Sequence, residues 1–195
     1  MSAEIQIISN YLDEASALME KSKSLARLID LAAELISTKM HTGGKILLCG
    51  NGGSAADAQH IAAEFVGQYL TPRKPLPALA ITTDSSILTA IGNDFGFDSV
   101  FSRQIQAMSL PNDVVVCYST SGRSQNILKA IEISRQLGLG IVNFSSERAP
   151  RVRDVIDIRI PSSVTPQIQQ LHLTLSHVLC EIVEIKLNKL NYSID

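Results

Sequence analysis

Gly50-Asn51-Gly52-Gly53-Ser54 is one of two stretches that decide the fold of this chain, and Ser119-Thr120-Ser121-Gly122-Arg123-Ser124 is the other. Each follows a short apolar run and precedes a segment of helical periodicity, so each is predicted to join a parallel strand to a helix. The first N–H groups of a helix lack intrahelical partners, and the helix dipole adds positive potential there. Both turns are therefore predicted to bind an anion. Neither contains the lysine of a P-loop, which favours a phosphate monoester over a nucleoside triphosphate.

Strands and helices are predicted to alternate outward from these turns. Strands are expected at residues 45–49, 78–82, 113–119, 140–144 and 155–160, and helices at about 54–70, 86–91, 99–109 and 124–137. This alternation predicts an α/β fold with a doubly wound, flavodoxin-like parallel sheet of five strands. Ligands of such sheets bind at the carboxyl ends of the strands, where both turns lie.

Further helices are expected at both ends of the chain. Two amphipathic helices, broken near residues 22–24, precede Gly43-Gly44 and carry more apolar surface than one sheet needs. Residues 1–42 are therefore predicted to be a helical oligomerisation segment. A long C-terminal helix is expected to begin with Thr165 as N-cap and Pro166 at its first position. We see no internal repeat, so residues 1–195 are expected to form a single domain.

Composition excludes several classes of function. The net charge is −2 and the basic residues are scattered, so a nucleic-acid partner is not expected. No apolar run approaches the roughly 20 residues that span a bilayer, and the N-terminus does not resemble a secretory signal. A cytoplasmic protein is therefore expected. The three cysteines (Cys49, Cys117 and Cys180) are an odd number. Cys49 and Cys117 lie in apolar strand segments, which indicates reduced, buried thiols.

His60 and Glu64 are candidates for chemistry because they are four residues apart on the helix that follows the first turn. Side chains at this spacing point from the same face. The pair could ligate a metal, or the carboxylate could act as a general base that the imidazole orients. An ordinary intrahelical surface pair is the alternative.

The C-terminal helix carries three further candidates. Gln169 and His177 are about 80° apart around the helix and separated by about 12 Å along it, so they could meet only around something between them. His172 is about 140° from His177, so the two histidines cannot share a pocket within one chain. We predict that His172 is a hydrogen-bonded packing or interface residue.

Asn93-Asp94-Phe95-Gly96-Phe97 is predicted to be a polar loop held by its phenylalanines, with Asp94 capping a backbone turn. Arg123 could add charge to a phosphate at the second turn or could point to solvent. His41 is expected at the end of a helix.

Together these motifs resemble the sugar isomerase (SIS) domain family and, within it, the phosphoheptose isomerases. The likeness covers nearly the whole chain. It rests on Cys49-Gly50-Asn51-Gly52-Gly53-Ser54, His60 with Glu64, Gly92-Asn93-Asp94-Phe95-Gly96-Phe97, Ser119-Thr120-Ser121-Gly122 with Ser124, and Ile168-Gln169 with His172 and His177.

The resemblance implies a homotetramer with active sites at subunit interfaces. It also implies the aldose–ketose isomerisation of sedoheptulose 7-phosphate to D-glycero-D-manno-heptose 7-phosphate, which leads to ADP-heptose and lipopolysaccharide. One zinc ion per subunit would be held by His60, Glu64, Gln169 and His177. Glu64 would be the catalytic base and His177 the acid.

The same resemblance assigns the substrate contacts. The phosphate would be bound by Ser119, Thr120, Ser121 and Ser124. The sugar would be contacted by Asn51, Gly52, Gly53, Ser54, Glu64, Asn93, Asp94 and Gln169.

The chain departs from the family pattern at a few positions. Gln167 and Gln170 stand where Arg and Glu are common, Arg123 replaces the usual Asn, and residues 145–150 lack a Gly-rich stretch. These changes bear on the choice of sugar more than on the reaction.

Two alternative functions remain open. One is a non-catalytic, phosphosugar-binding regulator, similar to the SIS relative that associates with the bacterial replication initiator; the presence of His60, Glu64 and His177 favours an enzyme. The other is a dinucleotide enzyme, because residues 50–55 fit a loose Gly-x-Gly-x-x-Gly/Ala pattern. Its acidic partner, expected about 20 residues later, is out of position.

Overall fold

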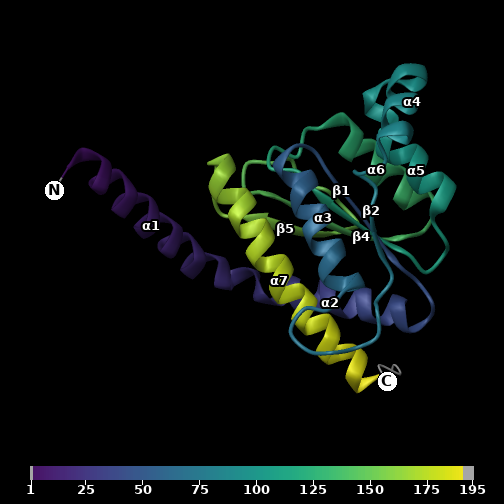
Figure 1. Ribbon diagram of the computed structural model, residues 1–195, viewed down its shortest axis with the longest axis horizontal. Coiled ribbons are helices and arrows are strands. Elements are labelled where there is room, and N and C mark those ends of the chain that lie inside the picture. The colour runs from purple at the N-terminus through teal and green to yellow at the C-terminus, as the bar shows by residue number, and fades with distance from the viewer. Residues whose placement is uncertain (1, 191–195) are drawn as a thin grey trace.

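Five parallel strands form the centre of the molecule in the computed structural model, which describes residues 2–190 (Figure 1). In spatial order they are β2 (Ala78–Ala80), β1 (Ile46–Gly50), β3 (Val114–Tyr118), β4 (Gly140–Ser146) and β5 (Ile156–Ile160). This is the flavodoxin-like order, with its switch point between β1 and β3. The predicted fold class is confirmed.

Helices cover both faces of the sheet because neighbouring strand residues point to opposite sides. Leu48, Val116 and Phe144 face α2 (Ala26–His41), α3 (Gly53–Val66) and α7 (Thr165–Lys189). Leu47 and Val115 face α4 (Ser85–Phe95), α5 (Val100–Met108) and α6 (Gln125–Gln136). Both turns that decided the fold thus connect a buried strand to a helix.

Several predicted boundaries differ from the observed ones. α3 ends at Val66 and does not reach residue 70. The prediction of a polar loop at residues 93–97 was wrong: Asn93 and Asp94 lie in the last turn of α4, and the cap of that helix is Asp84, whose carboxylate accepts from Ile87 N. The N-cap of α7 is Val164, so Thr165 is the first helical residue and not the cap.

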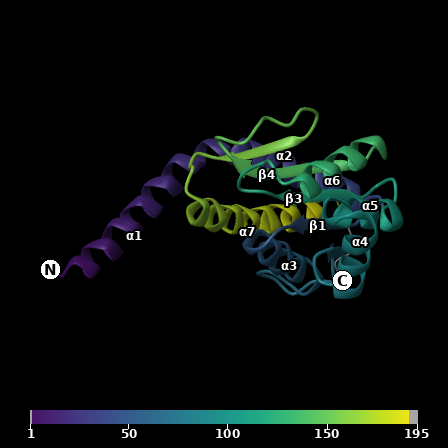
Figure 2. The same cartoon turned by 90° about the horizontal axis from the view of Figure 1, so that it is seen from above.

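The N-terminal helix α1 (Ala3–Ser22) extends away from the rest of the molecule in both views (Figures 1 and 2). The short helix η1 (Lys23–Leu25) joins it to α2, at the predicted break. The large apolar side chains of α1 are mostly exposed, with 51% of Ile5, 59% of Ile8, 61% of Leu12 and 42% of Met19 accessible. α1 therefore has an apolar stripe that its own chain does not cover.

The structure also shows the state of the cysteines and whether any helix could span a membrane. Cys49 and Cys117 are buried free thiols, as predicted, and Cys180 is one as well. Within residues 2–190, each helix is too short or too polar to cross a bilayer.

His172 lies in the core between α7 and the sheet, as expected for a packing residue. Its imidazole is fully buried beside Tyr118 and Phe144, and Nε2 lies 3.2 Å from the carbonyl oxygen of Ser145. A carbonyl accepts, so Nε2 carries the proton. Burial lowers the pKa of His172 to about 4.

His172 is expected to make the fold acid-sensitive. Between about pH 6.5 and pH 4 the unfolded chain binds a proton at this position and the folded chain does not, so the free energy of unfolding falls as the pH falls. The loss is about 3 kcal/mol across this window. Urea denaturation of the wild type and of His172→Gln, which keeps an N–H donor but does not titrate, measures it. Equal pH dependence in the two proteins would contradict the assignment.

Candidate active site at the carboxyl edge of the sheet

The first turn is shaped by glycine and by a pair of amides. Gly52 adopts a φ of +56°, a conformation that glycine tolerates best, and α3 begins at Gly53. A side chain at Gly53 would place its Cβ 2.5 Å from Nε2 of Gln169, so the glutamine lies directly against the turn. The Asn51 and Asn126 amides exchange two hydrogen bonds of 2.9 Å, which tie the turn to α6.

The second turn is held by its own hydroxyl groups. The Ser119 Oγ accepts a hydrogen bond of 3.1 Å from Gly122 N, and Ser121 Oγ accepts one of 3.2 Å from Arg123 N. Ser124 is the N-cap of α6, and its side chain makes no capping hydrogen bond. The Ser124 hydroxyl and the first N–H groups of α6 are thus available to a ligand.

A cleft of about 380 Å³ opens beside this turn; we call it the anion cleft. It is lined by Thr120, Ser121, Arg123, Ser146, Arg148, Ser163, Thr165 and Ile168. The lining combines two guanidinium groups with hydroxyl groups, and α6 and α7 both begin beside it. This combination suits a phosphate, since charge-assisted hydrogen bonds and helix N-termini both favour anions.

Arg148 is a residue that sequence reasoning missed. It follows β4 in the segment that was noted only for lacking glycines, and the lone arginine gave no signal of its own. The segment is held in place by Arg159, whose guanidinium donates to the backbone carbonyls of Ser146, Glu147 and Ala149. The prediction left two roles open for Arg123; the structure places it in the lining of the same cleft.

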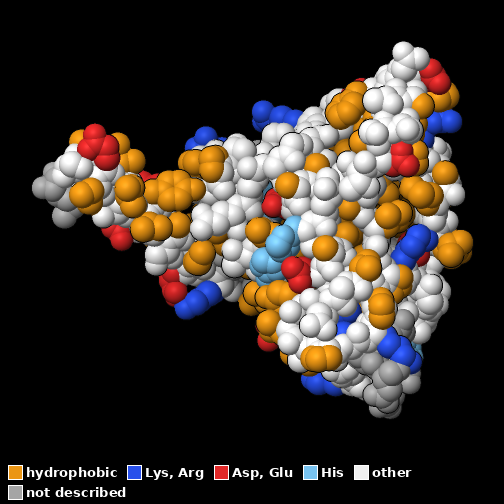
Figure 3. Space-filling model, viewed as in Figure 1, with side chains coloured by type: hydrophobic (Ala, Val, Ile, Leu, Met, Phe, Trp, Pro, Cys, Tyr) orange, Lys and Arg blue, Asp and Glu red, His pale blue; other side chains and the backbone are white. Residues whose placement is uncertain are grey.

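His60, Glu64 and His177 come together on the facing sides of α3 and α7; we call them the His–Glu–His trio. The Nε2 atoms of His60 and His177 are 2.9 Å apart, and Oε1 of Glu64 is 3.2 Å from Nε2 of His60. Their ligand atoms all lie within 4.8 Å of one another. Figure 3 shows the histidines at the surface in the middle of one face, with carboxylates beside them. Burial and the nearby His60 lower the pKa of His177.

The trio forms because α3 and α7 lie side by side and run in the same direction (Figures 1 and 2). Gln169 contacts Gly53 near the start of both helices, and His177 contacts His60 about two turns further along. Gln169 is therefore about 10 Å along α3 from the trio, and within one chain the structure does not bring it to the other three.

Asp57 is a second residue that sequence reasoning missed. It lies on α3 one turn before His60, on the face that also carries Glu64, so helical spacing could have revealed it. Its Oδ2 is buried and makes no hydrogen bond to the described residues. Burial raises the pKa of Asp57 to about 6, and the nearby His60 partly opposes this rise.

Within residues 2–190, Asn93 and Asp94 lie outside both the trio and the anion cleft. Both are exposed at the end of α4, where Asn93 Nδ2 donates to Asp94 Oδ1 at 2.7 Å. Ser54 is buried at the first turn of α3, behind the exposed Gly52 and Gly53.

The fold is a flavodoxin-like sheet, and its carboxyl edge carries the anion cleft. A cluster of side chains that can transfer protons lies on α3 and α7. These features are typical of an α/β protein that binds a phosphorylated small molecule. A model of the SIS domain matches residues 10–146. A phosphoheptose isomerase of Rhodospirillum rubrum is 52% identical over 155 residues, covering 78% of this chain and 82% of the relative. One of Solidesulfovibrio magneticus is 48% identical over 183 residues, covering 92% and 89%.

Solved structures agree with the sequence relatives. The phosphoheptose isomerase of Neisseria gonorrhoeae superposes with a TM-score of 0.86 at 36% identity, covering 93% of this chain and 99% of that one. The chain therefore belongs to the SIS domain family and, within it, to the phosphoheptose isomerases.

Proposed function

We propose that this protein converts sedoheptulose 7-phosphate to D-glycero-D-manno-heptose 7-phosphate, a step toward ADP-heptose and lipopolysaccharide. The observation that carries the proposal is the His–Glu–His trio in a chain of this family. A purely regulatory role would not require such a trio. The relatives are named phosphoheptose isomerases, which does not favour a regulatory role. A dinucleotide enzyme is likewise not favoured.

Glu64 is proposed as the base that moves the proton. The isomerisation removes a proton from C1 of the ketose, next to the C2 carbonyl, and returns a proton to C2 through an enediol. Oε1 of Glu64 faces His60, which leaves Oε2 to take and return that proton. His177 is proposed to give a proton from Nε2 to O2 as the enediol forms and to take the O1 proton as the aldose carbonyl forms, when this nitrogen holds no metal. Where zinc is bound, Nε2 would be a ligand, and the ion would polarise these oxygens instead.

The anion cleft is proposed to hold the phosphate. Ser119 shapes the turn, and the phosphate contacts are assigned to Thr120, Ser121, Ser124, Arg123 and Arg148. Tethering one end of an open-chain sugar phosphate uses remote binding energy to align the reacting end. The sugar contacts proposed are Asn51, Gly52, Gly53, Ser54, Asn93, Asp94 and Gln169.

Zinc is the metal that we propose for the trio. In a tetrahedral zinc site with ligands at about 2.0–2.2 Å, the ligand atoms are about 3.3 Å from each other. The separations of His60 Nε2 from the other two ligand atoms, 2.9 and 3.2 Å, are close to this spacing, and all three atoms lie within 4.8 Å of one another. Two imidazoles with a carboxylate are a ligand set that zinc accepts. Bound zinc supplies a Lewis acid that polarises substrate oxygens. Since Gln169 lies beside Gly53, we assign it to the substrate and not to this trio.

The test is to incubate the purified protein with sedoheptulose 7-phosphate, before and after treatment with a chelator. We expect an aldose phosphate product, loss of turnover on chelation and recovery on adding zinc. Absence of product from the zinc-loaded protein would refute the proposed reaction. Full activity in metal-free protein would refute only the role of zinc.

A homotetramer is proposed as the assembly, with residues 1–42 as its oligomerisation segment. The apolar stripe on α1 supports this, as does an apolar groove of about 330 Å³ between the end of α1, the start of α2 and α7. A cytoplasmic location is also proposed, because three buried free thiols suit a reducing compartment.

Leu12→Glu is expected to reduce the size of the assembly. It places a charge in the exposed apolar stripe, where a second subunit would have to bury it. Light scattering coupled to size-exclusion chromatography measures the mass, and Asn10→Glu is the matched control because residue 10 is exposed on the other side of α1. Equal masses for the wild type and both variants would exclude this stripe from the interface.

A further inference from the structure

His177 packs between two aromatic rings. The Tyr69 ring is stacked on it, with centroids 5.5 Å apart and planes 14° apart. The His60 ring meets it edge-on at 5.0 Å. Resting on the proposed catalytic role of His177, we propose that Tyr69 is a positioning residue for this imidazole and that the Arg73–Glu184 ion pair holds Tyr69 in place.

The orientation of the His177 ring matters because it decides which of the two ring nitrogens points toward His60 and Glu64. Its Nε2 contacts Nε2 of His60, while rotation about the Cβ–Cγ bond would turn a different ring edge toward His60 and Glu64. This terminal torsion is broad for a histidine side chain. A flat ring stacked on one face restricts that rotation, and offset aromatic stacking is favourable in itself.

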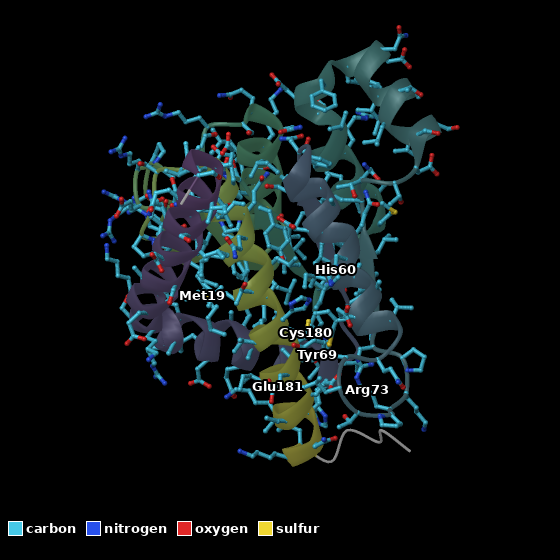
Figure 4. The ribbon with its side chains drawn as sticks, turned by 60° about the vertical axis from the view of Figure 1, so that its left-hand side comes forward. Met19, His60, Tyr69, Arg73, Cys180 and Glu181 are labelled. Atoms are coloured by element: carbon cyan, nitrogen blue, oxygen red, sulfur yellow. The ribbon has the colours of Figure 1, made fainter. Side chains whose placement is uncertain are left out.

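Tyr69 belongs to the irregular segment between α3 and β2, so it needs an external anchor. Figure 4 shows Tyr69 beside Cys180 of α7, with Arg73 on the same loop. The Arg73 and Glu184 side chains are only 2% and 7% exposed, and Arg73 Nε donates to Oε1 of Glu184 at 2.5 Å. The Thr71 hydroxyl donates to the other oxygen of Glu184 at 3.3 Å.

The guanidinium also fastens the end of α3. Nη2 of Arg73 donates to the carbonyl oxygen of Glu64 at 2.7 Å, and Nη1 donates to that of Phe65 at 2.9 Å. These carbonyls lie in the last turn of α3, where intrahelical donors run out. Arg73 thus connects the loop that carries Tyr69 to two places. One is the backbone of Glu64 in α3, and the other is Glu184, which lies in α7 two turns after His177.

The test compares Tyr69→Phe with Tyr69→Leu in the zinc-loaded protein. Phenylalanine keeps the stacked ring, whereas leucine keeps an apolar side chain but removes the ring. We expect Tyr69→Leu to lower kcat about 10-fold with KM changed less than twofold, and Tyr69→Phe to keep at least half of the wild-type kcat. Equal kcat in wild type and Tyr69→Leu would overturn the proposal.

A spectroscopic readout separates positioning from stability and from the choice of substrate. The proton resonances of the His177 ring should carry a ring-current shift that persists in Tyr69→Phe and disappears in Tyr69→Leu. The chain has four histidines, so His177→Gln assigns the signals. An unshifted His177 resonance in the wild type would overturn the stacking. If sedoheptulose 7-phosphate is not a substrate, the proposed reaction fails while this measurement still reports on Tyr69.

Arg73→Lys tests the anchor. Lysine keeps a positive charge opposite Glu184, but an ammonium cannot reproduce the planar set of donors that reaches two carbonyls and a carboxylate together. We expect at least half of the ring-current shift on His177 to be lost. Arg153→Lys, at an exposed position, is the matched control and should leave the shift unchanged. A wild-type shift in Arg73→Lys would remove Arg73 from the proposal.

Discussion

Replacing Glu64 by glutamine is expected to lower kcat for the isomerisation by about 10²- to 10⁴-fold, the usual contribution of a positioned general base. The amide is nearly isosteric with the carboxylate, so α3 and its contacts with α7 should remain. It cannot accept the C1 proton, because a neutral amide is a very weak base. The KM should change less than kcat, since the phosphate is bound elsewhere.

The measurement is the initial rate of aldose phosphate formation at saturating ketose. Glu132→Gln, the same change at an exposed site on α6, should behave like the wild type. Retention of more than a tenth of the wild-type kcat by Glu64→Gln would remove Glu64 from the proton transfer. Melting temperatures of both variants show whether a loss of rate comes from unfolding.

The double variant Arg123→Ala, Arg148→Ala is expected to lower kcat/KM by about 100-fold. Hydrogen bonds to charged groups contribute about 1.5–3 kcal/mol each, and both arginines are exposed, so about 10-fold for each is the lower end of that range. The effect should appear in KM and also in kcat, because the anchored phosphate helps to align the sugar. Steady-state kinetics at constant ionic strength measure both constants.

Arg151→Ala is the control for the cleft, because Arg151 is an exposed arginine near Arg148 that does not line it. If Arg151→Ala alone lowers kcat/KM by about 10-fold, the share expected of each cleft arginine, the effect is one of general charge and not of the cleft. An unchanged kcat/KM in the double variant would place the phosphate elsewhere.

Local patterns were enough to predict the fold and the proximity of His60 and Glu64. The parallel sheet follows from the alternation of apolar runs and helices, and the pairing of His60 with Glu64 follows from helical spacing alone. Asn93 and Asp94 were misassigned because polar residues and a glycine favour a loop, whereas the Asp84 cap and helical packing extend α4 through them.

What the sequence by itself determined is the set of features that depend on near neighbours: strands, helices, the turns that join them, and side chains on one helical face. The tertiary structure alone decided that His177 meets His60, that Gln169 lies against Gly53, that Arg148 joins the anion cleft and that Tyr69 covers His177. Periodicity acts over a few residues of one element. Contacts between α3 and α7, which are about a hundred residues apart, depend on how both helices pack on the same sheet, and no local pattern encodes that register.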